Sequence, residues 1–321
     1  MSDTPAPLSI LSSISEVERD TGIAKETLRV WERRYDFPRP QRDPHGERLY
    51  SQDQVARLRL VKRLLDQGHR PGKLMHQTTG LLAEMAGKTD SEARPAGEGA
   101  ELAHCIALLK SHQLQALRQH LAQAVLLLGM RRFVCELVAP LTDAVGAAWA
   151  AGQLAVFEEH LYSEALQGVL RHAIFGASQH ANHSQAHPRV LLSTLPQERH
   201  GLGLLMVEAL LTLEGAHCFS LGVQTPMADI VDAARAQHAD VVALSFSSGS
   251  TVRGAVANVQ RLQQQLGPAI EVWAGGACAQ QARRQLGRHC VVGLDGLAGM
   301  VTRWRGARQL GAGAENALPL C

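Results

Sequence analysis

Short apolar runs alternate with segments of helical spacing in the C-terminal third of the chain. We expect buried strands over residues 189–194, 216–221, 240–245 and 270–276, and a short fifth strand over 290–293. Helical patterns separate these runs, over 204–211, 227–237, 252–266 and 279–286. Strands that alternate with helices of this length are typical of a parallel, doubly wound sheet. Ligands bind to such sheets beyond the carboxyl ends of the strands.

The middle of the chain, over residues 100–178, has helical apolar spacing in almost every stretch. We expect helices over 100–109, 113–128, 130–150 and 156–175, and their short connections favour an up-and-down four-helix bundle. Polar linkers are expected on either side, over 83–99, where glycine is frequent from Gly87 on, and over 179–187. The last residues, 306–321, are small and mixed in character, and we expect a disordered tail.

The segment 1–82 combines short amphipathic helices with basic residues. Ser15 and Glu18 predict a capping box at the start of a first helix. Gly22 predicts a tight turn, and a basic second helix follows over residues 25–35. Helix, glycine turn and basic helix together are typical of a helix-turn-helix that binds DNA. A further amphipathic helix is expected over 52–65.

Composition limits the class of protein. The 321 residues suit two or three domains, and the 45% of hydrophobic residues is ample for their cores. No apolar run is long enough to cross a bilayer, so we expect no membrane partner. The six cysteines form no Cys-x-x-Cys pair and lie mostly in apolar segments, which favours reduced thiols in a cytoplasmic protein. The net charge of +2 by itself indicates little.

A carboxylate and a histidine follow the first strand of the predicted sheet. Glu198 stands two residues before His200, so it can orient the imidazole through one ring nitrogen and leave the other for a metal. Gly201 and Gly203 allow a bulky ligand to approach the backbone. Taken alone, a histidine on a loop is more often structural than a ligand.

Two more loops are expected at the same edge of the sheet. Ser245 and Ser247 follow the third strand, and the pair Gly275 and Gly276 ends the fourth. A glycine pair at a strand end is also an ordinary turn. The loops after the first, third and fourth strands nevertheless indicate together one ligand site that includes His200.

The stretch Glu198-x-His200-x-x-Gly203 resembles the Asp-x-His-x-x-Gly motif of cobalamin-binding domains. The resemblance implies a Rossmann-like domain over 188–305, with His200 as the lower axial ligand of cobalt. Glu198 takes the position of the aspartate, as in light-sensing regulators of the CarH/LitR type. The resemblance also implies that Ser245, Ser247, Gly275 and Gly276 line a slot for the displaced nucleotide tail. Ser247 departs from the family, which usually has an apolar residue there.

The strings 27–35 (TLRVWERRY) and 46–50 (GERLY) resemble a MerR-family winged helix. The resemblance implies contacts with operator DNA by Lys25, Arg29, Arg33, Arg48 and Tyr50. Arg29, Arg48 and Tyr50 are expected to bind phosphates, whereas Lys25 and Arg33 fit either phosphates or base edges. We expect Leu28 and Trp31 in the core. Ala24 departs from the pattern, because a residue with a capping side chain is expected at that position.

A tryptophan and a Glu-His pair stand near the break between the last two predicted helices of the bundle. Without context, Trp149 reads as a core residue, and Glu159 and His160 as a solvated pair. The spacing Trp-x9-Glu-His resembles the signature with which CarH-type regulators cover the upper, 5′-deoxyadenosyl group of coenzyme B12. Ala150 departs from the best-understood receptor of this type, in which a histidine follows the tryptophan.

The resemblance covers nearly the whole chain and implies a multidomain α and α/β protein that is not an enzyme. It implies a transcriptional repressor with adenosylcobalamin, and hence cobalt, as a light-sensing cofactor. The homo-oligomer, dimer to tetramer, would bind operator DNA in the dark and release it on illumination. Two alternatives stay open. The cobalamin domain could be a light-independent assembly platform, or the chain could be a methyltransferase-like component, because methyltransferases use the same bundle-plus-sheet module.

Overall fold

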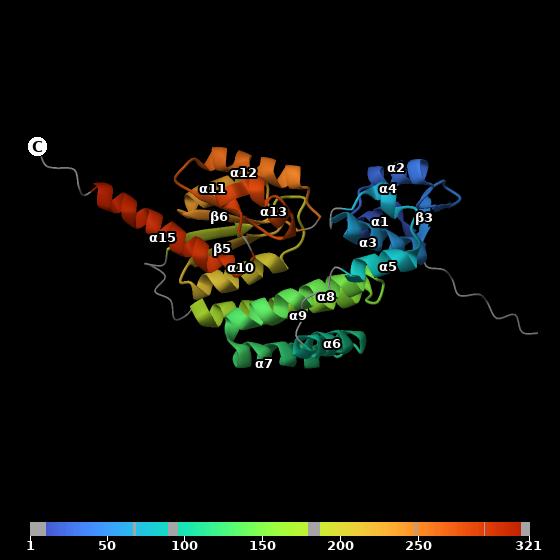
Figure 1. The fold of residues 1–321 in the computed structure, drawn as a ribbon, viewed down its shortest axis with the longest axis horizontal. Helices are drawn as coiled ribbons and strands as arrows, with labels where there is room; N and C mark the ends of the chain where they lie inside the picture. The colour runs from blue at the N-terminus through green and yellow to red at the C-terminus, as the bar shows by residue number, and fades with distance from the viewer. Residues whose placement is uncertain are drawn as a thin grey trace, which may run out of the picture. The chain divides into compact units, whose positions relative to one another are not determined.

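The computed structural model describes residues 11–66, 69–88, 96–178, 187–247, 249–291 and 293–315. The chain divides into two compact units. The first unit comprises Met1–Lys110 and Thr142–His160, and the second comprises Ser111–Leu141 and Leu161–Cys321. Figure 1 shows the elements of each unit along the chain.

The first unit contains the predicted winged helix-turn-helix. Its helices are α1 (Ile14–Thr21), α2 (Lys25–Tyr35), α3 (Gln52–Asp66), α4 (Pro71–Leu74) and α5 (Thr79–Lys88). Its antiparallel sheet has the order β1-β3-β2, with β1 at Leu11–Ser13, β2 at Gln41–Arg42 and β3 at Arg48–Ser51. Strands β2 and β3 form the wing, whose turn contains Gly46 at a φ of 83°. Leu28 and Trp31 of α2 are buried in the core, as the sequence predicted.

One helix start differs from the expectation and the other agrees with it. The capping box of α1 is formed by Ser13 and Glu16, not by Ser15 and Glu18, because β1 leads directly into the helix and Ser13 is the last extended residue before it. Ala24 gives α2 no side-chain cap. The carboxylate of Glu18 takes that role and accepts a hydrogen bond from the Lys25 backbone N–H at 3.1 Å.

The helical region between the predicted linkers consists of α6 (Ala96–Lys110), α7 (Leu114–Arg132), η1 (Phe133–Val138), α8 (Ala139–Ala150) and α9 (Val156–Ser178). Gly129 has non-helical angles inside α7, which places a break where the sequence predicted one. The segment η1 is a π-helix, which the periodicity did not predict. The linker expected over 83–99 is partly wrong, because α5 extends to Lys88 and α6 begins at Ala96. Residues 89–95 and 179–186 of the two linkers lie outside the described residues.

The second unit contains a parallel sheet in the order β5-β4-β6-β7. The strands are β4 (Arg189–Ser193), β5 (His217–Gly222), β6 (Val241–Ser245) and β7 (Glu271–Gly275). The connecting helices are α10 (Leu202–Leu213), α11 (Met227–Ala236), α12 (Val252–Leu266), α13 (Ala277–Gln281) and α14 (Arg283–Leu286), followed by η2 (Gly287–His289). The predicted fifth strand is reduced to one parallel bridge between Cys290 and Ala274.

The order of the strands defines where a ligand can bind. The chain leaves β4 toward β5 on one side and returns to β6 on the other side of β4. The loops after β4 and β6 therefore diverge, and such a switch point opens a crevice at the carboxyl edge of the sheet. Helices α11, α12 and α13 cover one face of the sheet, and α10 contacts β4, β5 and β6.

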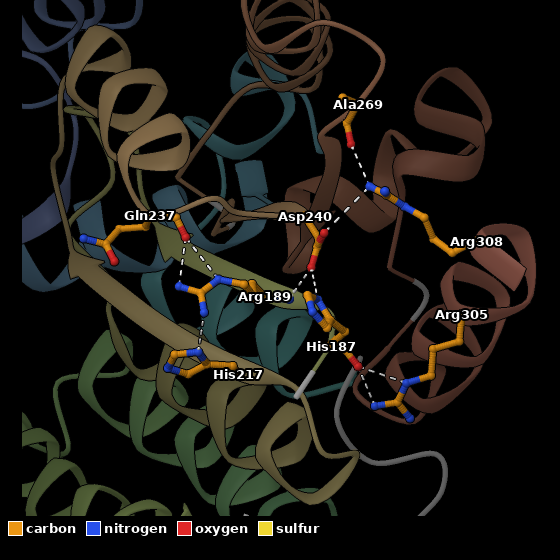
Figure 2. Close-up of polar contacts among 8 residues, drawn as sticks. All are labelled: His187, Arg189, His217, Gln237, Asp240, Ala269, Arg305 and Arg308. Carbon is orange, nitrogen blue, oxygen red and sulfur yellow. Dashed lines mark hydrogen bonds and ion pairs between the residues drawn. The ribbon is translucent and has the colours of Figure 1, made fainter. Parts of the chain in front are cut away.

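The opposite edge of the sheet anchors the C-terminal helix α15 (Gly296–Glu315), as Figure 2 shows. Arg305 donates hydrogen bonds to the carbonyl oxygens of His187 and Glu214. His187 in turn binds the carboxylate of Asp240 at 2.7 Å and stacks on Trp304. The expectation of a disordered tail from residue 306 is therefore wrong up to residue 315, since this segment continues a helix that is attached to the domain.

Candidate functional site

The loop after β4 is organised around a buried carboxylate. The side chain of Glu198 is 5% exposed. One of its oxygens, Oε1, accepts hydrogen bonds from the backbone N–H of His200 at 3.0 Å and from its ring Nδ1 at 2.6 Å. The other oxygen, Oε2, accepts a hydrogen bond from the backbone N–H of Ser247 at 2.7 Å, and Ser250 lies at 3.4 Å. Glu198 therefore connects the loop after β4 with the loop after β6 across the switch point.

Thr194 holds the backbone of this loop in place. Its hydroxyl donates to the carbonyl oxygen of Glu198 at 2.7 Å and accepts from the backbone N–H of Gln224 at 2.8 Å. The loops after three neighbouring strands are thus connected through two side chains. Thr194 is not among the residues predicted from the sequence, although a threonine at the end of a strand often satisfies loop backbone groups.

The geometry fixes which nitrogen of His200 can bind a metal. An ionised carboxylate only accepts hydrogen bonds, so Nδ1 carries the proton that is shared with Glu198. Nε2 is then the basic nitrogen of the ring. The side chain of His200 is 76% exposed, so the imidazole is presented outward on a buried support. A carboxylate that binds one ring nitrogen orients a metal-binding histidine in this way and leaves the other nitrogen for the metal.

The environment keeps Glu198 ionised. Burial by itself raises the pKa of this carboxyl group, but the hydrogen bonds from His200 and Ser247 outweigh burial and lower the pKa to about 2. The group therefore carries its negative charge at neutral pH.

Small residues allow the elements next to Glu198 and His200 to pack closely. A Cβ atom at Gly203 would lie 3.2 Å from the hydroxyl of Ser245, so the start of α10 and the end of β6 are in close contact. Ser245 pairs in register with Gly275 of β7. The structure thus brings Glu198, His200, Gly203, Ser245, Ser247, Gly275 and Gly276 to one edge of the sheet, as the sequence predicted.

The backbone geometry also requires glycine at position 276. Its φ is +92°, and a Cβ atom there would lie 2.4 Å from the carbonyl oxygen of Phe246. Only glycine fits such a close approach of two backbone segments. The glycine pair therefore fixes the loop after β6 against α13.

The donor set fits a metal that arrives inside a macrocycle. Within the described residues, no group of three or more His, Cys, Asp or Glu side chains could hold a bare metal ion. A cobalt held by a corrin ring would bring most of its own ligands, so one protein nitrogen would be enough to hold it. The exposed imidazole of His200, with the buried carboxylate of Glu198 behind it, would provide that nitrogen.

The residues expected at the upper face of the cofactor lie in the first unit. Trp149 stands one residue before the end of α8, and Glu159 and His160 lie in the first turns of α9. Nδ1 of His160 lies 2.7 Å from Oε2 of Glu159, within hydrogen-bond distance. The indole of Trp149 faces the guanidinium group of Arg59 from α3. The sequence analysis did not predict a role for Arg59.

The predicted DNA contacts fall into two groups. Arg29 and Arg33 are exposed and lie four residues apart on α2, so they share one face of this helix. Lys25 and Arg48 are partly buried, and each already has an acidic partner. Lys25 lies 3.6 Å from Glu18, and Arg48 binds Glu32 at 2.7 Å. A phosphate would therefore compete with these carboxylates.

The expectation of a phosphate contact by Tyr50 does not fit this structure. The Tyr50 side chain is fully buried in the core of the winged helix, and its hydroxyl has no hydrogen-bond partner among the described residues. Burial raises the pKa of this phenol. A side chain without exposed surface cannot reach a phosphate, so Tyr50 supports the wing from inside.

Three family models match the chain. Residues 12–75 match the MerR HTH family regulatory protein, and residues 100–174 and 188–300 match two models that are both described as a B12 binding domain. The protein is therefore a DNA-binding transcriptional regulator with a cobalamin-binding module. None of the helices in the described part of the chain has the length and apolarity to span a membrane.

Two regulators of Myxococcus xanthus are similar over most of their length. The HTH-type transcriptional repressor CarH is 33% identical over 81% of this chain and 86% of its own. The HTH-type transcriptional repressor CarA is 30% identical over 73% of this chain and 75% of its own. The chain belongs to the family of the CarH repressor. Among solved structures, the monomethylamine corrinoid protein of Methanosarcina barkeri matches 61% of this chain and 94% of its own, with 15% identity and a TM-score of 0.48.

The Glu198–His200 pair leads to a first prediction. Glu198→Gln removes the charge that orients the imidazole, so we expect cobalamin affinity to fall by about 10- to 100-fold. The lowered pKa also contributes stability that is complete above the ordinary pKa of a glutamate and is lost as the pH falls through about 2. The free energy of unfolding should therefore differ most between wild type and variant at neutral pH and converge in acid. Cobalamin titration and urea unfolding as a function of pH measure both effects.

Asp232→Asn, which changes an exposed carboxylate on α11, is the matched control and should alter neither quantity. An affinity for cobalamin that is unchanged in Glu198→Gln would show that Glu198 has no part in orienting the ligand.

Arg48 leads to a second prediction. Arg48→Ala should weaken operator binding about equally for all sequences and reduce the slope of log affinity against log salt by about one, because one phosphate contact is lost. Glu32→Gln should have the opposite effect on affinity, since it removes the carboxylate that competes for Arg48. Fluorescence anisotropy with labelled operator DNA at several salt concentrations measures both. An unchanged slope in Arg48→Ala would remove this residue from the interface.

Proposed function

We propose that this regulator is a repressor whose assembly on DNA depends on adenosylcobalamin and is reversed by light. The single observation that carries the proposal is the exposed imidazole of His200, which the buried carboxylate of Glu198 orients. Membership of the CarH family and the match to two cobalamin-binding models support it.

His200 would bind cobalt from below through Nε2. Glu198 is tied to both diverging loops, so the imidazole is held in one orientation before the cofactor arrives. Pre-orientation of this kind favours binding, because little side-chain freedom is lost on association. The crevice that receives the nucleotide tail would be lined by small residues from three loops, namely Gly203, Ser245, Ser247, Gly275 and Gly276.

Trp149, Glu159 and His160 would cover the adenosyl group from above. An indole can stack on adenine, and a Glu-His pair can hydrogen-bond a ribose. The cofactor, when bound, would supply the cobalt–carbon bond that visible light breaks. Ala150, which follows Trp149, is buried and has no atom that could bind a metal. We therefore propose that after illumination His200 alone holds the cobalamin, unless another histidine of the helical region replaces the lost upper group.

Assembly would convert cofactor binding into DNA binding. One winged helix contacts a single half-site, so specific binding normally requires a symmetric oligomer on a palindrome. A dimer or tetramer presents several such domains at once and gains affinity by avidity without any new contact. Loss of the adenosyl group would remove the packing against Trp149, dissociate the oligomer and release the operator.

A methyltransferase-like activity is the alternative from another class of protein. The winged helix at residues 12–75 and the similarity to repressors over most of the chain favour regulation. Turnover of a methyl donor and acceptor by the purified protein would restore the enzyme hypothesis.

The light response leads to a third prediction. In the dark, adenosylcobalamin should convert the protein into a larger oligomer and raise operator affinity by at least tenfold. Illumination of the same sample should reduce the mass to that of the free protein and reverse the gain in affinity. Light scattering and gel shift, with an absorption spectrum before and after illumination, follow the three quantities on one sample.

Two controls separate the outcomes. His200→Ala should bind cobalamin poorly and show no cofactor-dependent assembly. Methylcobalamin, which lacks the adenosyl group, should bind to wild type without assembling it. An oligomer that persists in the light would instead support the light-independent assembly platform, and would exclude the photoreceptor.

A further inference from the structure

The end of α8 and the turn that follows it contact helix α3 of the DNA-binding domain at two points, both within the first unit. The guanidinium carbon of Arg59 lies 5.1 Å from the centroid of the Trp149 ring. A Cβ atom at Gly152 would lie 3.8 Å from the Cβ of Ala56. Ala56 and Arg59 are three residues apart, so they share one face of α3.

Arg59 is held in a fixed orientation by a carboxylate of the helix-turn-helix. Its Nε lies 3.3 Å and its Nη2 2.7 Å from the two carboxylate oxygens of Asp20, in the last turn of α1. Both side chains are largely buried. A planar guanidinium group with its edge bound to a carboxylate presents its flat face to a neighbouring ring. Here that ring is the indole of Trp149.

The backbone that carries Arg59 is equally fixed. Val55, Leu58 and Val61 of α3 are buried in the core of the winged helix. The position of Arg59 is therefore set by the DNA-binding domain, although its contact partner belongs to the predicted cobalamin cap. Since Arg59 covers one face of the indole, a ligand can stack only on the other face.

We propose that Arg59 is a positioning residue for the adenosyl group. It orients the Trp149 ring through a cation–π contact, so that the second face of the indole is presented to the adenine. The inference rests on the proposed function, in which Trp149 covers this group. It goes further in one respect, because the residue that orients the cap is part of the DNA-binding domain. Cofactor and operator should then strengthen each other's binding by the same factor.

The test compares adenosylcobalamin with methylcobalamin, titrated in the dark into the full-length protein and followed by absorbance. The ratio of the two affinities isolates the contribution of the adenosyl group. Arg59→Gln combined with Asp20→Asn removes the cation without leaving an unpaired buried carboxylate. We expect the ratio to fall by about three- to tenfold, as for the loss of one partly desolvated cation–π contact, with the affinity for methylcobalamin unchanged.

Three further variants sharpen the result. Arg59→Lys keeps the charge but not the planar group, and should restore part of the ratio. In a Trp149→Leu background, the paired Arg59 and Asp20 changes should have no further effect, because both act through the same ring. Arg261→Gln, an exposed arginine on α12, should leave the ratio at the wild-type value. Circular dichroism and non-specific DNA binding check that each variant is folded.

The possible failures are distinguishable. A wild-type protein that binds both cobalamins equally well would overturn the proposed function together with the role of Arg59. A wild-type preference that persists in the folded Arg59 and Asp20 double variant would overturn the role of Arg59 alone. Additive effects of the Arg59 and Trp149 changes would also overturn it, since independent effects mean that the two side chains do not act through one contact.

Discussion

One buried carboxylate determines the geometry at the carboxyl edge of the parallel sheet, where we propose that cobalamin binds. Glu198 receives hydrogen bonds from the loop after β4 and from the loop after β6, which diverge on either side of the switch point. The same carboxylate binds Nδ1 of His200, so one side chain both connects the two loops and orients the imidazole. A neutral residue at this position would leave both loops and the imidazole with weaker partners. An ionised carboxylate at this position therefore satisfies both loops and the imidazole at once.

The two rings that we propose to meet the cofactor are supported by different kinds of contact, each within its own unit. In the second unit, backbone N–H groups and a threonine hydroxyl hold the Glu198 residue, and its carboxylate holds the imidazole of His200. In the first unit, Trp149 is in contact with Arg59, which is itself paired with Asp20. In each case a charged group that is satisfied on one side orients the ring that would meet the cofactor. The difference is that Arg59 belongs to the DNA-binding domain, which under the proposed function would give cofactor and operator a physical route to influence each other.

The sequence predicted most of the elements, because their signals are local. The helices at 25–35 and 252–266 have the predicted bounds, and the four main strands begin or end within a residue of theirs. The failures depend on tertiary contacts. The helix over 296–315 was missed because its attachment through Arg305 and His187 joins distant segments. Tyr50 was assigned to the surface because its type and position suit a phosphate contact, whereas packing places it in the core. Arg59 has no sequence signal, since only the fold brings it to Trp149.

The most direct test of the account is whether the lower ligand of cobalt is a protein histidine. The protein loaded with cobalamin and reduced to cobalt(II) gives an electron paramagnetic resonance spectrum that is split by the axial nitrogen. We predict a triplet in ordinary protein that becomes a doublet when the histidines carry the heavy nitrogen isotope, and no doublet from the labelled His200→Ala variant. A triplet that labelling leaves unchanged would contradict the account, because the nitrogen would then belong to the cofactor's own base.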